Sequence, residues 1–131
     1  MKEKPDKPGE KPPEKAVKKN TLWVLAHLRD EVRGWPAEAK EEMGAQLNKI
    51  EYGGEPDDFK PMQTIGKGVN EIRVSDAGDQ YRLIYVAKFP EAIYVLHVIT
   101  KKKTQQTSKS DIDKAKSRYG NLLEWRKEQN L

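Results

Sequence analysis

The stretch YRLIYVAKFPEAIYVLHVITKKK (81–103) decides the fold. It contains two runs rich in β-branched and aromatic residues, 81–87 and 93–99, separated by the short turn FPEA (89–92). Such runs are typical of strands, and so short a connection predicts that they pair in an antiparallel manner. The second run is apolar except at His97, which favours a central strand covered on both faces.

A third strand precedes this pair. Glu71 and Arg73 alternate with Ile72 and Val74, which is the period of two expected of a strand with one buried face. The turn DAGD (76–79) follows directly, and its glycine can adopt the positive φ that tight turns require. The three strands therefore form a predicted antiparallel meander.

Two apolar stripes with helical spacing come before the strands. Thr21 can cap the first helix, Pro36 suits the first turn of the second, and Gly53-Gly54 ends it. These segments predict a helical hairpin over residues 21–52, whose stripes need a partner surface to bury them. The stripes consist of Leu22, Leu25, Leu28, Val32 and Trp35 in the first helix and Ala39, Met43, Leu47 and Ile50 in the second.

A last amphipathic segment follows the strands, with Thr107, Ser108 or Ser110 as its cap. Its apolar stripe consists of Ile112, Ala115, Tyr119 and Leu122. Residues 55–68, with two prolines and two glycines, are predicted to form a loop. We therefore expect an α+β fold, in which an N-terminal helical hairpin packs on a three- to four-stranded antiparallel sheet and a C-terminal helix follows.

The length of 131 residues favours one domain, with residues 1–20 as a disordered Lys/Pro-rich tail and residues 21–131 as the folded part. The absence of cysteine excludes disulfides and thiol nucleophiles, and with two histidines no metal site or cofactor is expected. No apolar run approaches the roughly 20 residues of a membrane-spanning helix. The N-terminus also lacks the apolar core of a secretory signal. A cytoplasmic protein is therefore expected.

Charge is unevenly distributed along the chain. Residues 1–20 carry a net charge of +3, residues 21–59 carry −5 and residues 60–110 carry +5. A localised basic region favours a polyanionic partner such as RNA. The alternative is a solvated surface of mixed charge.

Three segments resemble the RelE/ParE superfamily of toxins from type II toxin–antitoxin systems. They are KPMQTIGKGVNEIRV (60–74), QYRLIYVAKFPEAIYVLHVITKKKTQQT (80–107) and SDIDKAKSRY (110–119), and the hairpin at 21–52 is similar as well. The resemblance is greatest to the phage-derived HigB-like branch. It implies a RelE-like fold, cleavage of mRNA, often on the ribosome, and inhibition by a cognate antitoxin of the helix-turn-helix class.

The chain departs from the family pattern just after the predicted strand at 93–99. The usual run of a basic residue followed by Thr, Gln, Lys and Thr is here KTQQT (103–107), with Gln106 where the family has lysine. Residues 101–103 also include one extra lysine. These differences leave the register of the basic residues open.

Cleavage of RNA without metal requires a base for the 2′-hydroxyl, cations for the phosphate and an acid for the leaving oxygen. Members of the superfamily use Arg, Lys and sometimes His or Tyr for these tasks. Arg73, Arg82 and His97 are accordingly the predicted catalytic residues. The predicted RNA-binding residues are Lys101, Lys102, Lys103 and Tyr85, the last by stacking on bases.

Each residue also has a structural alternative. Arg82 lies in an apolar strand and can pair with Glu71 or an aspartate, and Arg73 can be an ordinary solvent-facing residue. In a regular strand His97 shares a face with Ile93, Val95 and Ile99, which favours a core histidine. Two other functions remain open as well: a ParE-like poison of DNA gyrase without nuclease activity, and an inactive relative that binds nucleic acid.

Overall fold

The computed structural model describes residues 18–103 and 106–131. Most of the predicted tail, residues 1–17, lies outside this range, and Asn20 already begins a strand. The elements, in chain order, are β1 (Asn20–Trp23), α1 (Ala26–Arg33), α2 (Ala37–Glu51), β2 (Phe59–Pro61), β3 (Val69–Asp76), β4 (Asp79–Val86), β5 (Ala92–Lys102) and α3 (Lys109–Glu128). The α+β class is confirmed.

The strands form one five-stranded sheet in the order β1-β5-β4-β3-β2. The predicted meander is present, because β3 pairs with β4 and β4 with β5, both antiparallel. Two short strands extend it. β2 pairs antiparallel with β3 inside the segment predicted as a loop, and β1 pairs parallel with β5. The sheet is therefore mixed, and the prediction of three or four antiparallel strands was incomplete.

The prediction of a helix beginning at Thr21 was wrong. Residues Asn20–Trp23 form β1, and α1 begins only at Ala26. Leu22 and Leu25, assigned to the helical stripe, are 45% and 40% exposed, whereas the stripe from Leu28 onward is buried. The β-branched and aromatic side chains of this segment suit a strand, and its backbone supplies hydrogen bonds to the edge of apolar β5.

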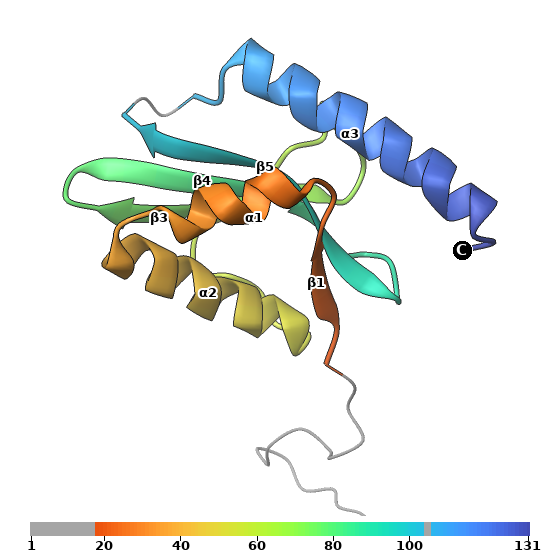
Figure 1. The fold of residues 1–131 in the computed structure, drawn as a ribbon, viewed down its shortest axis with the longest axis horizontal. Coiled ribbons are helices and arrows are strands. Elements are labelled where there is room, and N and C mark those ends of the chain that lie inside the picture. Colours follow the sequence, from red (N-terminus) through yellow and green to blue (C-terminus); the bar gives the residue numbers. More distant parts are fainter. Residues whose placement is uncertain (1–17, 104–105) are drawn as a thin grey trace, which may run out of the picture.

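Three layers result, with the sheet in the middle (Figure 1). The hairpin of α1 and α2 packs on one face, which we call the hairpin face, and α3 packs on the other, the α3 face. The hairpin face carries Ile72, Val74, Tyr81, Leu83, Tyr85, Ile93, Val95 and Val98. The α3 face carries Val69, Ile84, Val86, Tyr94, Leu96 and Ile99. Side chains alternate between the faces along β3 and β4, as in regular strands.

β5 breaks this alternation. Ile84 pairs with His97 but Tyr85 pairs with Val95, so Leu96 is an extra residue on β5. Such a bulge changes which side chains point to which face. Leu96 lies in the core under α3 and His97 contacts α3 residues, whereas Val95 lies on the hairpin face. The expectation that His97 shares a face with Ile93 and Val95 was therefore wrong.

The start of α3 is capped by Ser108, one of the three predicted candidates. Its hydroxyl accepts a hydrogen bond from the backbone N–H of Asp111 at 3.1 Å and donates one to the Asp111 carboxylate at 2.7 Å. This exchange places Asp111 in the first turn of α3, over the α3 face of the sheet. Across the described ranges, no helix combines the length and apolarity needed to cross a membrane.

Candidate functional site

The two predicted catalytic arginines are brought together by strand register. Arg73 on β3 and Arg82 on β4 are direct cross-strand partners. Both alternate with hairpin-face residues, so both belong to the α3 face. Arg82 is fully buried, whereas 17% of the Arg73 side chain is exposed. Neighbouring strands therefore bring Arg73 and Arg82 together as a cross-strand pair on one face of the sheet.

A single buried carboxylate lies between the arginines. Glu71 accepts a hydrogen bond from Arg73 Nε at 3.2 Å, and the same oxygen lies 3.9 Å from Arg82 Nη1. The other oxygen accepts a hydrogen bond from the Thr107 hydroxyl at 2.5 Å. Glu71 is fully buried, so it compensates much of the positive charge in the pair. The structural alternative for Arg82, pairing with Glu71, is therefore present in this structure.

Arg82 makes two more hydrogen bonds around this carboxylate. It donates to Gln80 Oε1 at 2.6 Å and to Thr107 Oγ1 at 3.1 Å. Burial lowers the pKa of Arg82, and the nearby Glu71 carboxylate opposes that shift. A guanidinium nevertheless stays protonated in proteins, so Arg73 and Arg82 both keep their positive charge beside Glu71.

His97 belongs to a neighbouring polar group on the same face. Asp111 Oδ1 lies 2.7 Å from His97 Nε2, and Arg118 Nη1 lies 2.8 Å from His97 Nδ1. Since arginine can only donate, Nδ1 accepts and Nε2 carries the proton that is donated to Asp111. Burial, chiefly, lowers the pKa of His97, with Asp111 opposing the shift and Arg118 adding to it. His97 is thus neutral here, and both of its nitrogens are engaged.

The lysines at 101–103 lie at the C-terminal end of β5, close to Arg82 in the sheet. Lys102 pairs with Gln80, the residue whose side chain binds Arg82. Lys103 is exposed and forms an ion pair with Asp79. Lys101 is exposed and adopts a φ of +58°. The Lys102 side chain lies outside the described part of the chain, as do Thr104 and Gln105 of the divergent KTQQT run; Gln106 is exposed.

Tyr85 does not join this site. It is 3% exposed and packs in the core on the hairpin face, on the other side of the sheet from Arg82. Burial raises the pKa of its hydroxyl to about 12. A side chain enclosed in this way cannot stack on an RNA base, so the expected role of Tyr85 does not fit the structure. The sequence contained a signal for this placement. Successive side chains of a strand point to opposite faces, and Tyr81 and Tyr85 are one and three positions from Arg82.

Several residues of the site were missed. Lys60 on β2 is exposed and pairs with Glu71, which places it on the α3 face beside the arginines. Thr107, Asp111 and Arg118 complete the two polar groups. No sequence pattern marks Lys60, because β2 is only three residues long. Asp111 and Arg118 are seven residues apart, which is two turns of α3, and this spacing was the available signal.

A metal centre is not among the features of this site. Within the described ranges, no three His, Asp or Glu side chains come together in a way that can hold a metal ion. The polar side chains on the α3 face are mostly cations and their counterions, which suits phosphate binding.

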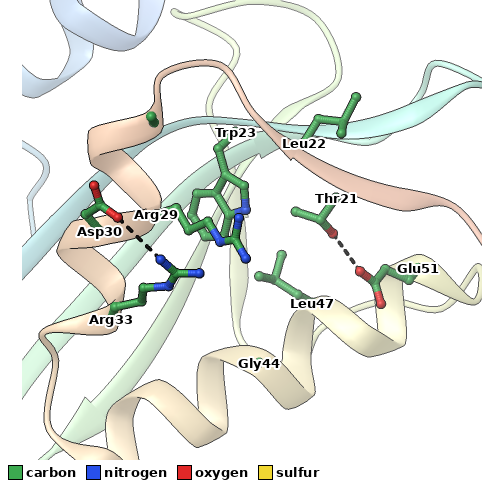
Figure 2. A pocket seen from close by; sticks show the side chains of 10 residues that line it. Thr21, Leu22, Trp23, Arg29, Asp30, Arg33, Gly44, Leu47 and Glu51 are labelled. Carbon is green, nitrogen blue, oxygen red and sulfur yellow. Dashed lines mark hydrogen bonds and ion pairs between the residues drawn. The ribbon is translucent and has the colours of Figure 1, made fainter.

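A separate groove of about 660 Å³ lies between β1, α1 and α2 (Figure 2). Its polar side chains are partly paired with one another: Arg33 lies 3.6 Å from Asp30, and the Thr21 hydroxyl donates to Glu51 at 2.8 Å. None of the residues predicted for RNA cleavage lines this groove. We therefore assign the candidate site to the α3 face alone.

Comparison with known proteins assigns the chain to a family. No curated protein matches the sequence. Residues 30–120 match the family described as phage-derived protein Gp49-like (DUF891). The matched segment runs from within α1 into α3 and includes Arg73, Arg82 and His97. The chain therefore belongs to the phage-derived Gp49-like family, which is part of the RelE/ParE-like toxin superfamily.

Proposed function

We propose that the protein is the toxin of a type II toxin–antitoxin system, of the HigB-like kind, and that it cleaves mRNA without a metal ion. The observation that carries this proposal is the cross-strand pair of Arg73 and Arg82 on the α3 face. Family membership supports a toxin-like protein with an antitoxin partner. The cytoplasm, the ribosome and a helix-turn-helix antitoxin belong to the same proposal.

The proposed reaction is an internal transfer at the RNA phosphate. The 2′-oxygen forms a bond to the adjacent phosphorus while the bond to the 5′-oxygen breaks, giving a 2′,3′-cyclic phosphate and a 5′-hydroxyl end. The 2′-hydroxyl gives its proton to a base, and the leaving oxygen takes one from an acid. The extra negative charge develops on the phosphate oxygens, where guanidinium groups bind two oxygens at once.

In this proposal Arg73 meets the phosphate first, since part of its side chain is exposed, and Arg82 adds charge from beneath. Lys60 and the lysines at the end of β5 contribute to backbone binding. His97, neutral in this structure, is the candidate base, and the proton that it accepts from the 2′-hydroxyl can then pass to the leaving oxygen. His97 is buried and engaged, so it acts only after Arg118 or Asp111 releases one of its nitrogens.

The test is an RNA cleavage assay with and without translating ribosomes. It compares the wild type with Arg73→Ala and Arg82→Ala, and uses Arg29→Ala on α1 as a control of equal charge change on the opposite side. We expect message cleavage by the wild type and the control, with losses on the order of 100-fold for each site variant, the scale typical of one electrostatic contact. Growth arrest with intact mRNA contradicts the nuclease proposal.

One observation favours a rival function. The buried Glu71–Arg82 pair and the two engaged nitrogens of His97 leave little of this site presented to a substrate. A gyrase poison or an inactive nucleic-acid-binding relative does not need a presented site. The poison produces double-strand DNA breaks and an SOS response without loss of message, and the inactive relative is harmless when expressed, so the same cells distinguish all three.

A further inference from the structure

We infer that three exposed lysines, Lys60, Lys67 and Lys88, form a phosphate-binding strip that guides an RNA strand along the α3 face toward Arg73. This inference rests on the proposed function and deepens it, because it names the path of the substrate beyond the scissile phosphate. We call these three residues the lysine strip.

Lys60 marks the end of the strip next to the arginines. It lies on β2, at the edge of the sheet, and pairs with Glu71 on β3. Directly opposite residues of antiparallel strands project to the same face, so Lys60 stands on the α3 face one strand away from the Glu71 carboxylate. Its exposure leaves the ammonium available to an RNA phosphate.

Lys88 marks the other end of the strip. Its ammonium lies 5.9 Å from the ring centroid of Tyr119 on α3 and 5.4 Å from that of Phe89. These cation–π contacts hold the exposed head group on the α3 side. Its stem packs against Gly68, where a Cβ would lie only 2.8 Å from Lys88 Cδ. Gly68 has a φ of +84°, the backbone conformation that favours glycine.

In the sequence, Lys67 lies between Lys60 and Lys88, on the loop that leads into β3. A Cβ at the preceding Gly66 would lie 2.2 Å from the Tyr119 ring, which shows how closely this loop packs on α3. The Tyr119 hydroxyl donates to the Lys67 carbonyl at 3.5 Å. The Lys67 side chain is exposed. The two flanking glycines therefore let the backbone bring Lys67 close to Tyr119 and Lys88.

The strip continues the cationic site. Arg73 comes four positions after Val69 in β3, a distance of about 13 Å at the usual rise of a strand. Within residues 18–103 and 106–131, none of the three lysines forms an ion pair. Three acids of this face, Glu71, Asp111 and Glu91, are engaged by Arg73, His97 and Arg126. An exposed acid, Asp58, precedes β2.

The experiment measures binding of a short single-stranded 2′-O-methyl RNA, which cannot be cleaved, as a function of salt. It compares the wild type with Lys60→Gln/Lys88→Gln and with the control Lys40→Gln/Lys127→Gln, which removes the same charge from α2 and from the end of α3. For single strands each lost phosphate contact lowers the salt slope by about 0.7, so the strip variant is expected to lose about 1.4 and the control nearly nothing. In cleavage assays the strip variant raises KM and leaves kcat unchanged.

Equal losses in both double variants overturn the inference, since net charge alone then explains binding. A strip variant that keeps its RNA slope but no longer binds an oligoglutamate peptide also overturns it, because the strip then serves an acidic polypeptide. If the wild type neither binds nor cleaves RNA, the proposed function fails. If the wild type cleaves RNA and the strip variant behaves like it in both assays, only the strip fails.

Discussion

Arg73 on β3 and Arg82 on β4 are direct partners across two neighbouring strands, on the face of the sheet that α3 covers. Two facing cations repel each other, and Glu71, 3.2 Å from one and 3.9 Å from the other, offsets that repulsion. The arrangement keeps two guanidinium groups in a largely dry environment, where they act strongly on an entering phosphate.

Removing the compensating carboxylate is expected to destabilise the fold. Glu71→Gln leaves Arg82 buried without its counterion, and we expect the free energy of unfolding in urea to fall by about 3–5 kcal/mol. Glu71→Gln combined with Arg82→Met removes both charges and is expected to recover most of that loss. A single variant as stable as the wild type shows that Glu71 does not compensate Arg82.

His97 predicts a dependence of stability on pH. Burial lowers its pKa, so the folded protein binds this proton less readily than the unfolded chain, whose pKa is about 6.5. The stability contribution is therefore full above that value and is lost as pH falls toward the folded pKa. Melting temperatures between neutral and mildly acidic pH should fall more steeply for the wild type than for His97→Gln. His27→Gln changes an exposed histidine of α1 and serves as the control. Its melting temperature should depend on pH as that of the wild type does.

A second ion pair, between Arg126 and Glu91, attaches the C-terminal end of α3 to the rest of the fold. Arg126 donates to both oxygens of Glu91 at 2.6 and 3.0 Å, and the Tyr94 hydroxyl donates to the same carboxylate at 2.8 Å. These bonds lower the pKa of Glu91 to about 2, with the Arg126 hydrogen bond as the main cause. The contribution to stability is present above the ordinary glutamate pKa and is lost as pH falls from there toward 2.

Arg126→Ala should therefore lower the free energy of unfolding at neutral pH, with solvent screening limiting the size of the loss. Arg126→Lys should recover only part of it, because an ammonium cannot bind both oxygens in a fork. Lys127→Ala is the neighbouring control, since its ion pair with Glu124 is exposed and worth little. Equal losses of stability in the alanine variants at 126 and 127 contradict a specific contribution of the Arg126–Glu91 pair.

A substitution at Tyr85 tests whether the hairpin face takes part in RNA cleavage. Tyr85→Phe removes a hydroxyl that hydrogen-bonds the Asn70 side chain in the core, so we expect a loss of about 1 kcal/mol in unfolding free energy. RNA cleavage should be unchanged, because the ring lies on the hairpin face. A folded variant with impaired cleavage would show that Tyr85 reaches the substrate after all.

The regular elements could be predicted because their patterns are local. The apolar runs at 81–87 and 93–99 correspond to β4 and β5, and the stripe of Tyr119 and Leu122 corresponds to α3. β1 was missed because Leu22 and Leu25 continue the helical spacing of α1 by coincidence. Its strand conformation depends on pairing with β5, some seventy residues away in the chain. β2 is too short to show any period.

For the site, the sequence alone determined that basic residues gather on adjacent strands, because a meander with short turns allows few other arrangements. Only the tertiary structure decided that Arg73 and Arg82 face each other over Glu71, that a bulge turns His97 toward Asp111 and Arg118, and that Tyr85 lies on the far side. The physical reason is that periodicity records burial within a segment, whereas register, bulges and helix placement arise from contacts between distant segments.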